Sequence, residues 1–318
     1  MADYRVGVDL GGTNIKVGAV DEKNNIIARV TRKTLPQRGW EAIADDIATA
    51  ALDVLKAAGG KGDRAYIGIG SPGTVDAKAG TVDFAGNLGW EKIPIVKAVS
   101  ARAGMPVYLG NDADCAALGE YIAGAAKNCA SALLLTLGTG VGGGAVFGGK
   151  IFAGGGLGGA EFGHIILVAG GEQCTCGRRG CFEAYCGATA LIRDARRAAA
   201  ENADSLINVM CGGDMSKIDG KLPFDAAKAG DAAAKRVVER YIELLGEGIC
   251  DLVNLFRPEI VLISGGVSAQ GEYLTEPLNA FLRTHAFAGE RVPIPRVKIA
   301  MLGNDAGIIG AANLRDAR

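Results

Sequence analysis

Two glycine-rich segments of similar pattern constrain the fold of this chain more than any other feature. They span residues 5–20 and 132–147, and their turns read Asp-Leu-Gly-Gly-Thr at 9–13 and Leu-Gly-Thr-Gly at 137–140. In each segment an apolar run precedes the turn, and two further apolar runs follow it. This pattern predicts a strand, a tight turn, a second strand and a third short strand. We therefore expect two copies of one unit, each at the start of a domain.

The rest of the chain alternates between predicted helices and strands. Apolar residues at helical spacing predict helices over 43–55, 93–103, 226–256 and 273–284, and others that begin near Asp114, Ala184 and Asn304. Short β-branched runs predict strands at 65–69, 106–109, 259–263 and 297–302. Such alternation is typical of α/β proteins with mixed sheets that are covered on both faces.

We expect two domains, because a chain of 318 residues can build two substantial cores. The boundary is predicted just after Asp112. This gives a small α/β domain over 1–112 and a large α/β domain over 113–303. The last helix, over 304–318, is expected to join the small domain.

The charge of the chain nearly cancels, with 34 basic and 35 acidic residues. This balance does not favour nucleic acid or an anionic membrane as a partner. The uncharged stretch at 128–149 is interrupted by glycines, so we interpret it as buried strand and turn. The N-terminus shows no signal-peptide pattern, and five of the eight cysteines are scattered among small and apolar residues. These features predict a cytoplasmic protein.

One histidine and three cysteines form the most specific local signal. His164 is followed ten residues later by Cys174, Cys176 and Cys181, in a Cys-x-Cys-x4-Cys pattern. One imidazole and three thiolates fill a tetrahedral zinc shell and leave no open position for a catalytic water. The sequence therefore predicts a structural Zn²⁺ site in the large domain. Glu161 and Glu183 flank this cluster and are not needed as ligands, so they require another role.

The turn at 9–13 allows two interpretations. The backbone of Gly11 and Gly12 can cradle phosphate oxygens, Thr13 can add a hydroxyl, and Asp9 can hold magnesium through water. The alternative is a plain hairpin turn, since the sequence lacks the ending of a Walker motif. The turn at 137–140 carries the same chemistry and the same alternative. Two such turns in two similar domains predict a nucleotide that is held from both sides of a cleft.

Three other strand ends also have two interpretations. A carboxylate such as Asp112 at the end of a strand points toward the usual ligand cleft of an α/β sheet and can act as a general base. Alternatively, Asn111, Asp112 or Asp114 caps the following helix, and spacing alone favours the cap. The segments 264–266 and 303–305 either contact a nucleotide or only begin helices, and the second reading is favoured.

Taken together, these motifs resemble those of the ROK family of sugar kinases and repressors, within the actin-like ATPase superfamily. The resemblance covers nearly the whole chain, from Asp9 to Gly307. Its motifs are those at 9–13, 68–73 (Gly-Ile-Gly-Ser-Pro-Gly), 87–90 (Asn-Leu-Gly-Trp), 111–113 (Asn-Asp-Ala), 137–140, 161–164 (Glu-Phe-Gly-His) and 174–183. The resemblance implies a two-domain actin-like ATPase (ribonuclease H-like) fold with a nucleotide cleft between the domains.

The resemblance also implies phosphorylation of a hexose by ATP and Mg²⁺, with Asp112 as the base. The implied hexose contacts are Asn87, Asn111, Asp112, Glu161, His164 and Glu183, and His164 would bind zinc as well. The implied nucleotide contacts are Asp9, Gly11, Gly12, Thr13, Lys16, Gly138, Thr139, Gly140, Gly265 and Gly266. The implied assembly is a homodimer or a dimer of dimers, without nucleic acid or membrane.

Within the family the sequence looks most like the bacterial glucokinase branch, through 87–90 and 302–307. This implies glucose, phosphorylated at its 6-hydroxyl. The sequence departs from that branch at 154–159 and at Cys186, so N-acetylglucosamine, N-acetylmannosamine, fructose and allose remain alternative substrates. Two other classes are a sugar-responsive repressor and a non-catalytic sugar sensor. The repressor is disfavoured because Asp9 is expected to leave no room ahead of it for a helix-turn-helix.

Overall fold

The computed structural model describes residues 4–60, 65–155 and 161–317. These residues divide into two compact units. Among the described residues, 4–60, 65–134, 143–155 and 300–317 form the first unit, and 135–142 and 161–299 form the second. The stretch at 154–159, where the sequence departs from the glucokinase branch, lies outside the described residues from position 156 onward.

The first unit is built on a five-stranded sheet with strand order β3-β2-β1-β4-β8. Its strands span Arg5–Leu10 (β1), Asn14–Val20 (β2), Ile26–Lys33 (β3), Ile67–Ser71 (β4) and Val107–Asn111 (β8). Strands β1, β2 and β3 pair antiparallel, whereas β1, β4 and β8 pair parallel. Because parallel strands end at the same edge of a sheet, the 9–13 turn and Asn111 lie along one edge.

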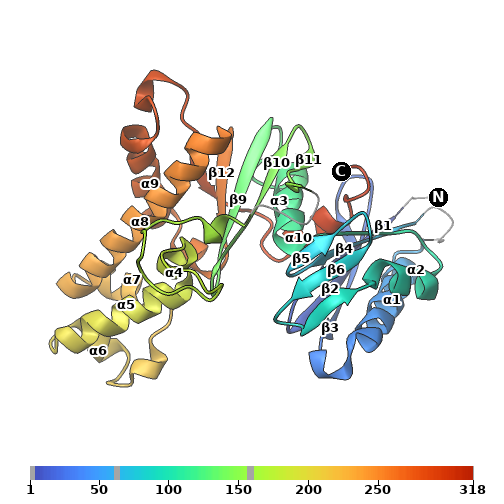
Figure 1. Ribbon diagram of the computed structural model, residues 1–318, viewed down its shortest axis with the longest axis horizontal. Helices are drawn as coiled ribbons and strands as arrows, with labels where there is room; N and C mark the ends of the chain where they lie inside the picture. The colour runs from blue at the N-terminus through green and yellow to red at the C-terminus, as the bar shows by residue number, and fades with distance from the viewer. Residues whose placement is uncertain (1–3, 61–64, 156–160, 318) are drawn as a thin grey trace. The chain divides into compact units, whose positions relative to one another are not determined.

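Helices cover both faces of this sheet (Figure 1). They span Pro36–Arg38 (η1), Trp40–Ala57 (α1), Ile95–Ala103 (α2), Asp112–Ala123 (α3) and Asp305–Ala311 (α10). Val6 and Val8 of β1 share a buried core with Ile47 of α1. Gly7 lies between them and faces the other side, where a Cβ atom would overlap the backbone of Ile308 in α10. The lack of a side chain at Gly7 therefore lets α10 pack directly on the sheet.

A three-stranded antiparallel sheet extends the first unit and was not predicted from the sequence. It consists of Thr74–Asp76 (β5), Thr81–Ala85 (β6) and Trp90–Ile93 (β7). The strands are three to five residues long, too short for alternation between apolar and polar residues to stand out. Trp90 is buried in the core of the unit, and Asn87 lies in the turn that precedes it.

The second five-stranded sheet has the order β11-β10-β9-β12-β13. Its strands span Ser131–Leu137 (β9), Val141–Phe147 (β10), Lys150–Ile151 (β11), Ile260–Ser264 (β12) and Arg296–Ile299 (β13). The division between the two compact units falls within β9 and β10. The two sheets have the same order. Each begins with the three strands of a glycine-turn segment in reverse chain order, and continues with two later strands that pair parallel with each other, β4 with β8 and β12 with β13. The shared order confirms that the two segments are copies of one unit.

The second unit is rich in helices. They span Phe162–His164 (η3), Glu183–Cys186 (α4), Ala188–Glu201 (α5), Leu206–Met210 (α6), Met215–Lys217 (η4), Leu222–Lys228 (α7), Ala232–Phe256 (α8), Gly266–Gln270 (η5), Glu272–His285 (α9) and Gly289–Arg291 (η6). The single helix predicted over 226–256 was wrong at its start, because Gly230 (φ +95°) separates α7 from α8. Asp231 then caps α8, accepting a hydrogen bond from the backbone N–H of Ala234.

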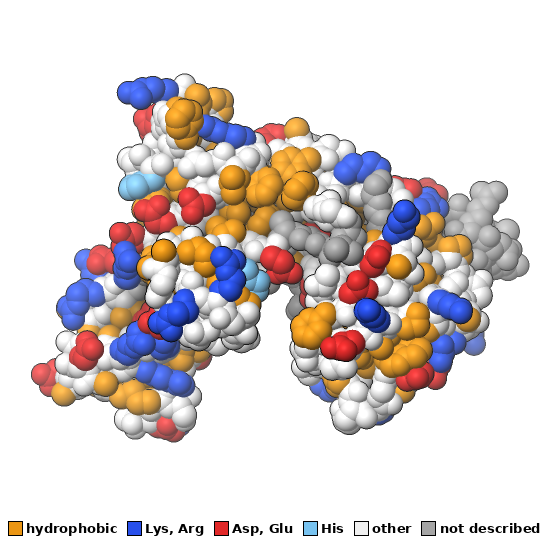
Figure 2. Space-filling view, viewed as in Figure 1, with side chains coloured by type: hydrophobic (Ala, Val, Ile, Leu, Met, Phe, Trp, Pro, Cys, Tyr) orange, Lys and Arg blue, Asp and Glu red, His pale blue; other side chains and the backbone are white. Residues whose placement is uncertain are grey.

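Among the described residues, no helix combines the length and apolar character needed to cross a bilayer. Basic and acidic side chains are interspersed on the face shown in Figure 2. The uncharged stretch at 128–149 forms β9, β10 and their connecting turn, as expected.

Candidate active site and metal centre

The first glycine turn brings an acidic and a basic side chain together at a strand end. Lys16 Nζ lies 3.1 Å from Asp9 Oδ2 and also donates to Asn304 Oδ1 at 3.1 Å. Asp9 and Lys16 lie directly opposite each other in the antiparallel pair of strands β1 and β2. Both side chains are partly exposed, at 22% for Asp9 and 31% for Lys16. A carboxylate and an ammonium that remain open to solvent can still meet a ligand.

The backbone of this turn is fixed from within the first unit. Gly11 N–H donates to Asn14 O, and the buried Thr34 hydroxyl donates to Gly11 O at 2.6 Å. Thr13 is exposed at the tip of the turn. The amide of Asn87 lies beside Gly12, since a Cβ atom there would approach Asn87 Nδ2 to 3.3 Å. Asn87 and the first glycine turn, predicted for hexose and nucleotide respectively, are thus neighbours.

Asn111 caps helix α3, as spacing had favoured. Its Oδ1 accepts from the backbone N–H groups of Ala113 and Asp114, at 2.9 and 3.2 Å. Its Nδ2 donates to Gly73 O at 3.1 Å. Asp112 is the first residue of the helix and accepts from Ala113 N–H at 2.9 Å. The cap interpretation is therefore correct for Asn111, and the cap fixes the backbone at the neighbouring Asp112.

A cavity of about 390 Å³ adjoins this strand end within the first unit. Asn111 and Asp114 line it, together with Lys78 from the turn that follows β5. Its volume is within the usual range for small-molecule sites.

The second glycine turn packs against α5 and β12 in the second unit. Gly138 O accepts from Ala188 N–H at 2.8 Å, and Thr139 O accepts from the hydroxyl of Thr189 at 3.0 Å. Gly265 has a φ of +85°, and a Cβ atom there would overlap the backbone of Leu137. Both the predicted turn and the Gly265-Gly266 segment are therefore held in one place by close backbone contact.

Glu183 connects the second turn to the cysteine loop. Its Oε2 accepts from Val141 N–H at 3.2 Å, and its Oε1 accepts from the Thr175 hydroxyl at 2.9 Å. A Cβ atom at Gly140 would overlap the Glu183 carboxylate, so a side chain at this position would require Glu183 to move from the turn. The Cys174 thiol also approaches Glu183 Oε1, at 3.6 Å. Glu183 is thus placed by the turn on one side and the loop on the other.

Glu161 and His164 are positioned by a short 3₁₀ helix. Phe162 is buried, and Gly163 packs against the backbone of Val141, where a Cβ atom would overlap the carbonyl. His164 N–H donates to Glu161 O at 3.0 Å. The Glu161 side chain itself is exposed.

The structure brings the four predicted metal ligands together. The ligand atoms of His164, Cys174, Cys176 and Cys181 all lie within 4.8 Å of one another. Cys176 Sγ and Cys181 Sγ are 3.6 Å apart, and Cys174 Sγ is 3.7 Å from His164 Nδ1. A tetrahedral zinc ion with Zn–S bonds of about 2.3 Å separates its sulfur ligands by about 3.8 Å. The donor set therefore fits Zn²⁺ in type, number and spacing.

Burial and hydrogen bonding shift the pKa values of two of these thiols in opposite directions. Burial, together with hydrogen bonds to Cys176 and Cys174, raises the pKa of Cys181 to about 12. The backbone N–H of Arg178 lowers the pKa of Cys176. A divalent cation would reverse the first effect, because it stabilises all three thiolates at once.

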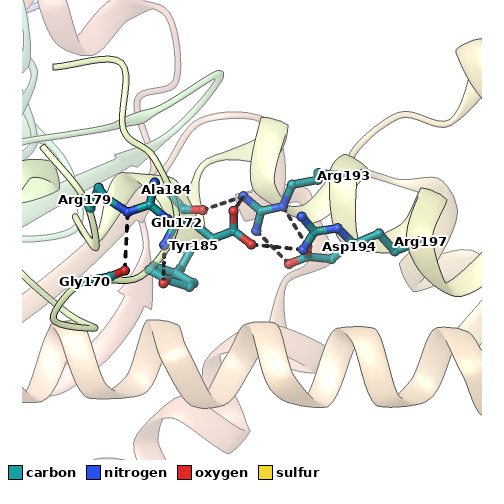
Figure 3. A network of polar contacts seen from close by, with 8 residues as sticks. All are labelled: Gly170, Glu172, Arg179, Ala184, Tyr185, Arg193, Asp194 and Arg197. Atoms are coloured by element: carbon teal, nitrogen blue, oxygen red, sulfur yellow. Dashed lines mark hydrogen bonds and ion pairs between the residues drawn. The ribbon is translucent and has the colours of Figure 1, made fainter. Parts of the chain in front are cut away.

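An arginine network that the sequence did not reveal supports the cysteine loop (Figure 3). Glu172, two residues before Cys174, pairs with Arg197 at 2.9 Å and with Arg193 at 3.8 Å. Hydrogen bonding from Arg197 lowers the pKa of Glu172. The Tyr185 hydroxyl accepts from Glu172 N–H at 2.8 Å. Because Arg193 and Arg197 belong to α5, the network ties the loop to that helix.

Each predicted site residue is described, and most of them cluster within their own unit. Asp9, the 11–13 turn and Lys16 lie with Asn87 and Asn304 in the first unit, and Glu183 lies with the 138–140 turn in the second. The sequence does not predict the contact of Asn304 with Lys16. It places 303–305 at the end of a strand predicted over 297–302, whereas β13 already ends at Ile299. Nor does it predict Thr175 as a partner of Glu183, for which no sequence signal exists.

Comparison with known proteins identifies the relatives of this chain. The family model described as ROK family matches residues 5–318. A glucokinase of Thermotoga maritima is 39% identical over 316 residues, which are 97% of this chain and 96% of that protein. The crystal structure of a ROK family glucokinase from Streptomyces griseus, in complex with glucose and AMPPNP, is 37% identical, with a TM-score of 0.80 over 98% of both chains.

A second solved structure, the ROK hexokinase from Thermus thermophilus, is 35% identical with a TM-score of 0.83, covering 99% of this chain and 97% of that one. The mixed sheets of this chain match those structures, which confirms the expected actin-like ATPase fold. With the family model matching all but its first four residues, this chain belongs to the ROK family.

Proposed function

We propose that this chain is an ATP-dependent glucokinase, which transfers the γ-phosphoryl group of ATP to the 6-hydroxyl of glucose. The observation that carries the proposal is the likeness, over nearly the whole chain, to glucokinases, one of them solved with glucose and AMPPNP. The arrangement of Asn111 and Asp112 at one strand end agrees with this chemistry.

Asp112 is the proposed general base. It accepts the proton of the sugar 6-hydroxyl as that oxygen bonds to the γ-phosphorus and the bond to the ADP oxygen breaks. The cap made by Asn111 holds the first turn of α3, and therefore fixes the Asp112 backbone. A base held in place in this way contributes on the order of 10²–10⁴-fold to the rate.

The proposed hexose contacts are Asn87, Asn111 and Asp112 in the first unit and Glu161, His164 and Glu183 in the second. Carboxylates and amides suit a sugar because each hydroxyl donates a hydrogen bond. His164 turns Nδ1 toward the thiols, so Nε2 on the other side of the ring is the nitrogen proposed for a sugar hydroxyl. Buried acceptors left without a donor would disfavour the wrong epimer.

The proposed nucleotide contacts in the first unit are Asp9, Gly11, Gly12, Thr13 and Lys16. Those in the second unit are Gly138, Thr139, Gly140, Gly265 and Gly266. Lys16 offers a positive charge to the phosphates. Asp9 is the proposed carboxylate that holds Mg²⁺ through water, and this cation supplies neutralisation of phosphate charge.

Zn²⁺ is the proposed structural ion of His164, Cys174, Cys176 and Cys181. It would fix the loop that carries Thr175 and so hold Glu183 in place. We also propose a homodimer or dimer of dimers and a cytoplasmic location. The proposed domains are 1–112 with 304–318 and 113–303, and they differ from the compact units, which group residues 113–134, 143–155 and 300–303 with the first unit.

A comparison of acceptor sugars tests this function. The initial rate of ADP release is measured at fixed, saturating ATP with glucose, N-acetylglucosamine, N-acetylmannosamine, fructose and allose. We expect the highest kcat/KM with glucose. A higher value with another sugar would assign the chain to a different ROK kinase. Binding of glucose without any ADP release would favour a non-catalytic sensor.

A further inference from the structure

Glu120 of α3 is a completely buried acidic residue, and both of its carboxylate oxygens accept hydrogen bonds from backbone N–H groups. Its exposed fraction is 0%. Oε2 accepts a hydrogen bond from Ala125 N–H at 2.8 Å, and Oε1 accepts one from Leu302 N–H at 2.6 Å. A buried carboxylate that accepts two N–H groups has a defined orientation, because loss of either bond leaves a buried polar group unpaired.

The two N–H groups come from segments far apart in the sequence. Ala125 follows the end of α3, where Gly124 lies so close to the Glu120 carboxylate that a Cβ atom would overlap it. Leu302 lies 182 positions after Glu120, in the turn that leads into α10. The same turn contains Gly303, whose φ is +52°. Glu120 therefore fixes this turn to α3.

The turn held by Glu120 continues directly to Asp9 and Lys16. Asn304 Oδ1 accepts from Lys16 Nζ at 3.1 Å, and Lys16 pairs with Asp9 at the same distance. Gly307 of α10 lies against Asp9, since a Cβ atom there would approach Asp9 Cγ to 3.1 Å. The position of the 302–307 segment thus decides where the Asp9 carboxylate and the Lys16 ammonium point.

We infer that Glu120 is a positioning residue of the nucleotide site, which acts through Leu302 and Asn304 on Lys16 and Asp9. The inference rests on the proposed function, in which Lys16 and Asp9 meet ATP and its cation. Glu120 also belongs to the helix that begins with Asp112. Glu120 follows Asp112 by eight residues, which is a rise of about 12 Å along the helix axis. One rigid element therefore carries the proposed base and holds the segment that places the phosphate contacts.

The matched control for Glu120 is Asp231 in the second unit. Its carboxylate also accepts two backbone N–H bonds, from Leu206 at 2.7 Å and Ala234 at 2.6 Å, and its exposed fraction is 9%. Removing either carboxylate costs stability for the same reason. Asp231 contacts none of the residues proposed for ATP or glucose. A difference in kinetics between the two sets of variants therefore reports position and not stability.

The experiment measures KM for ATP and KM for glucose in Glu120→Gln, Glu120→Ala, Asp231→Asn and Asp231→Ala. For the Glu120 variants we expect KM for ATP to rise about tenfold and KM for glucose to stay within about twofold. The Asp231 variants should keep both constants within about twofold while their Tm falls. Glu120→Gln retains the packing volume and decides the question if Glu120→Ala does not fold. Unchanged KM for ATP in the folded Glu120 variants would overturn the inference.

A double-mutant cycle with Asn304→Ala tests whether Glu120 affects ATP binding through the turn that contains Leu302 and Asn304. If Glu120 acts through the 302–304 turn, Glu120→Gln should change KM for ATP by no more than about twofold when Asn304 is already alanine. Independent, multiplying effects would overturn the inference. The same assays separate a failure of this inference from a failure of the proposed function. If the wild-type protein does not phosphorylate glucose, the proposed function fails; if it does, the variants test Glu120 alone.

Discussion

At the scale of single residues, the proposed phosphoryl transfer depends on Asp112. Its carboxylate accepts from Ala113 N–H, and Asn111 holds the helix start on which it sits. Asp112→Asn keeps the shape and the cap but removes the proton acceptor. We expect kcat to fall by about 10²–10⁴-fold. Affinity for glucose, measured by calorimetry, should change little, since the amide still contacts the sugar. Near-normal turnover would remove Asp112 from the role of base.

Gly140 is required by its contact with Glu183, and its neighbour Gly138 provides the control. A Cβ atom at Gly140 would overlap the Glu183 carboxylate, whereas one at Gly138 would meet no atom within 4 Å. Gly140→Ala should therefore lower the free energy of unfolding by about 1–3 kcal/mol. Gly138→Ala should change it by less than about 0.5 kcal/mol. Urea unfolding measures both. Equal losses in the two variants would contradict the assigned contact.

At the scale of elements, the cysteine loop shapes the second unit around Glu183. Removal of the proposed Zn²⁺ should free the loop that contains Thr175, whose hydroxyl donates to Glu183 Oε1. We expect a chelator to weaken glucose binding, measured by calorimetry, before ATP binding changes. The opposite order, with ATP binding lost first, would contradict this assignment.

Zinc content provides a direct check on the ligands. Elemental analysis of the reduced protein should give about one zinc per chain. Cys174→Ser should lose the metal, whereas Cys250→Ser should retain it, because Cys250 is buried in α8 beside Asn254 and is not part of the cluster. Metal-free wild-type protein, prepared without chelator, would count against the site.

The start of α8 contributes a pH-dependent part of the stability. Burial opposes ionisation of Asp231, but hydrogen bonds from the N–H groups of Ala234 and Leu206 outweigh it and lower the pKa of Asp231. A folded-state pKa below the unfolded value of about 3.9 means that this stabilisation is present above that pH and is lost as pH falls further. The free energy lost in Asp231→Asn should therefore be larger at neutral pH than below about pH 3. An equal loss of unfolding free energy at the two pH values would contradict the lowered pKa of Asp231.

The regular elements followed from local sequence, with identifiable exceptions. Helices α1 and α9 and strands β8 and β12 lie close to their predicted positions. The two helices have a strong apolar period, and the two strands begin as short runs of apolar and β-branched residues. The β5-β6-β7 sheet was missed because its strands are too short to show a period. The break between α7 and α8 depends on Gly230 and on the Asp231 cap, which a helical period overlooks.

At the scale of the whole molecule, the repeated glycine segment predicted the architecture. Both copies produced the same strand order, and the motifs led to the ROK family. Single motifs also predicted the four metal ligands, since their spacing is local. The contacts of Asn304 with Lys16 and of Glu120 with Leu302 join segments that are 288 and 182 positions apart. No local pattern contains them, so they became visible only in the fold.

The proposed reaction transfers a phosphoryl group from ATP to the 6-hydroxyl of glucose. Phosphorus NMR of the wild-type protein with ATP, Mg²⁺ and glucose is the decisive measurement, because it identifies both the donor product and the phosphorylated oxygen. We expect ADP and glucose 6-phosphate in equal amounts. ATP consumption without sugar phosphate, or phosphate on a different oxygen of glucose, would rule this reaction out.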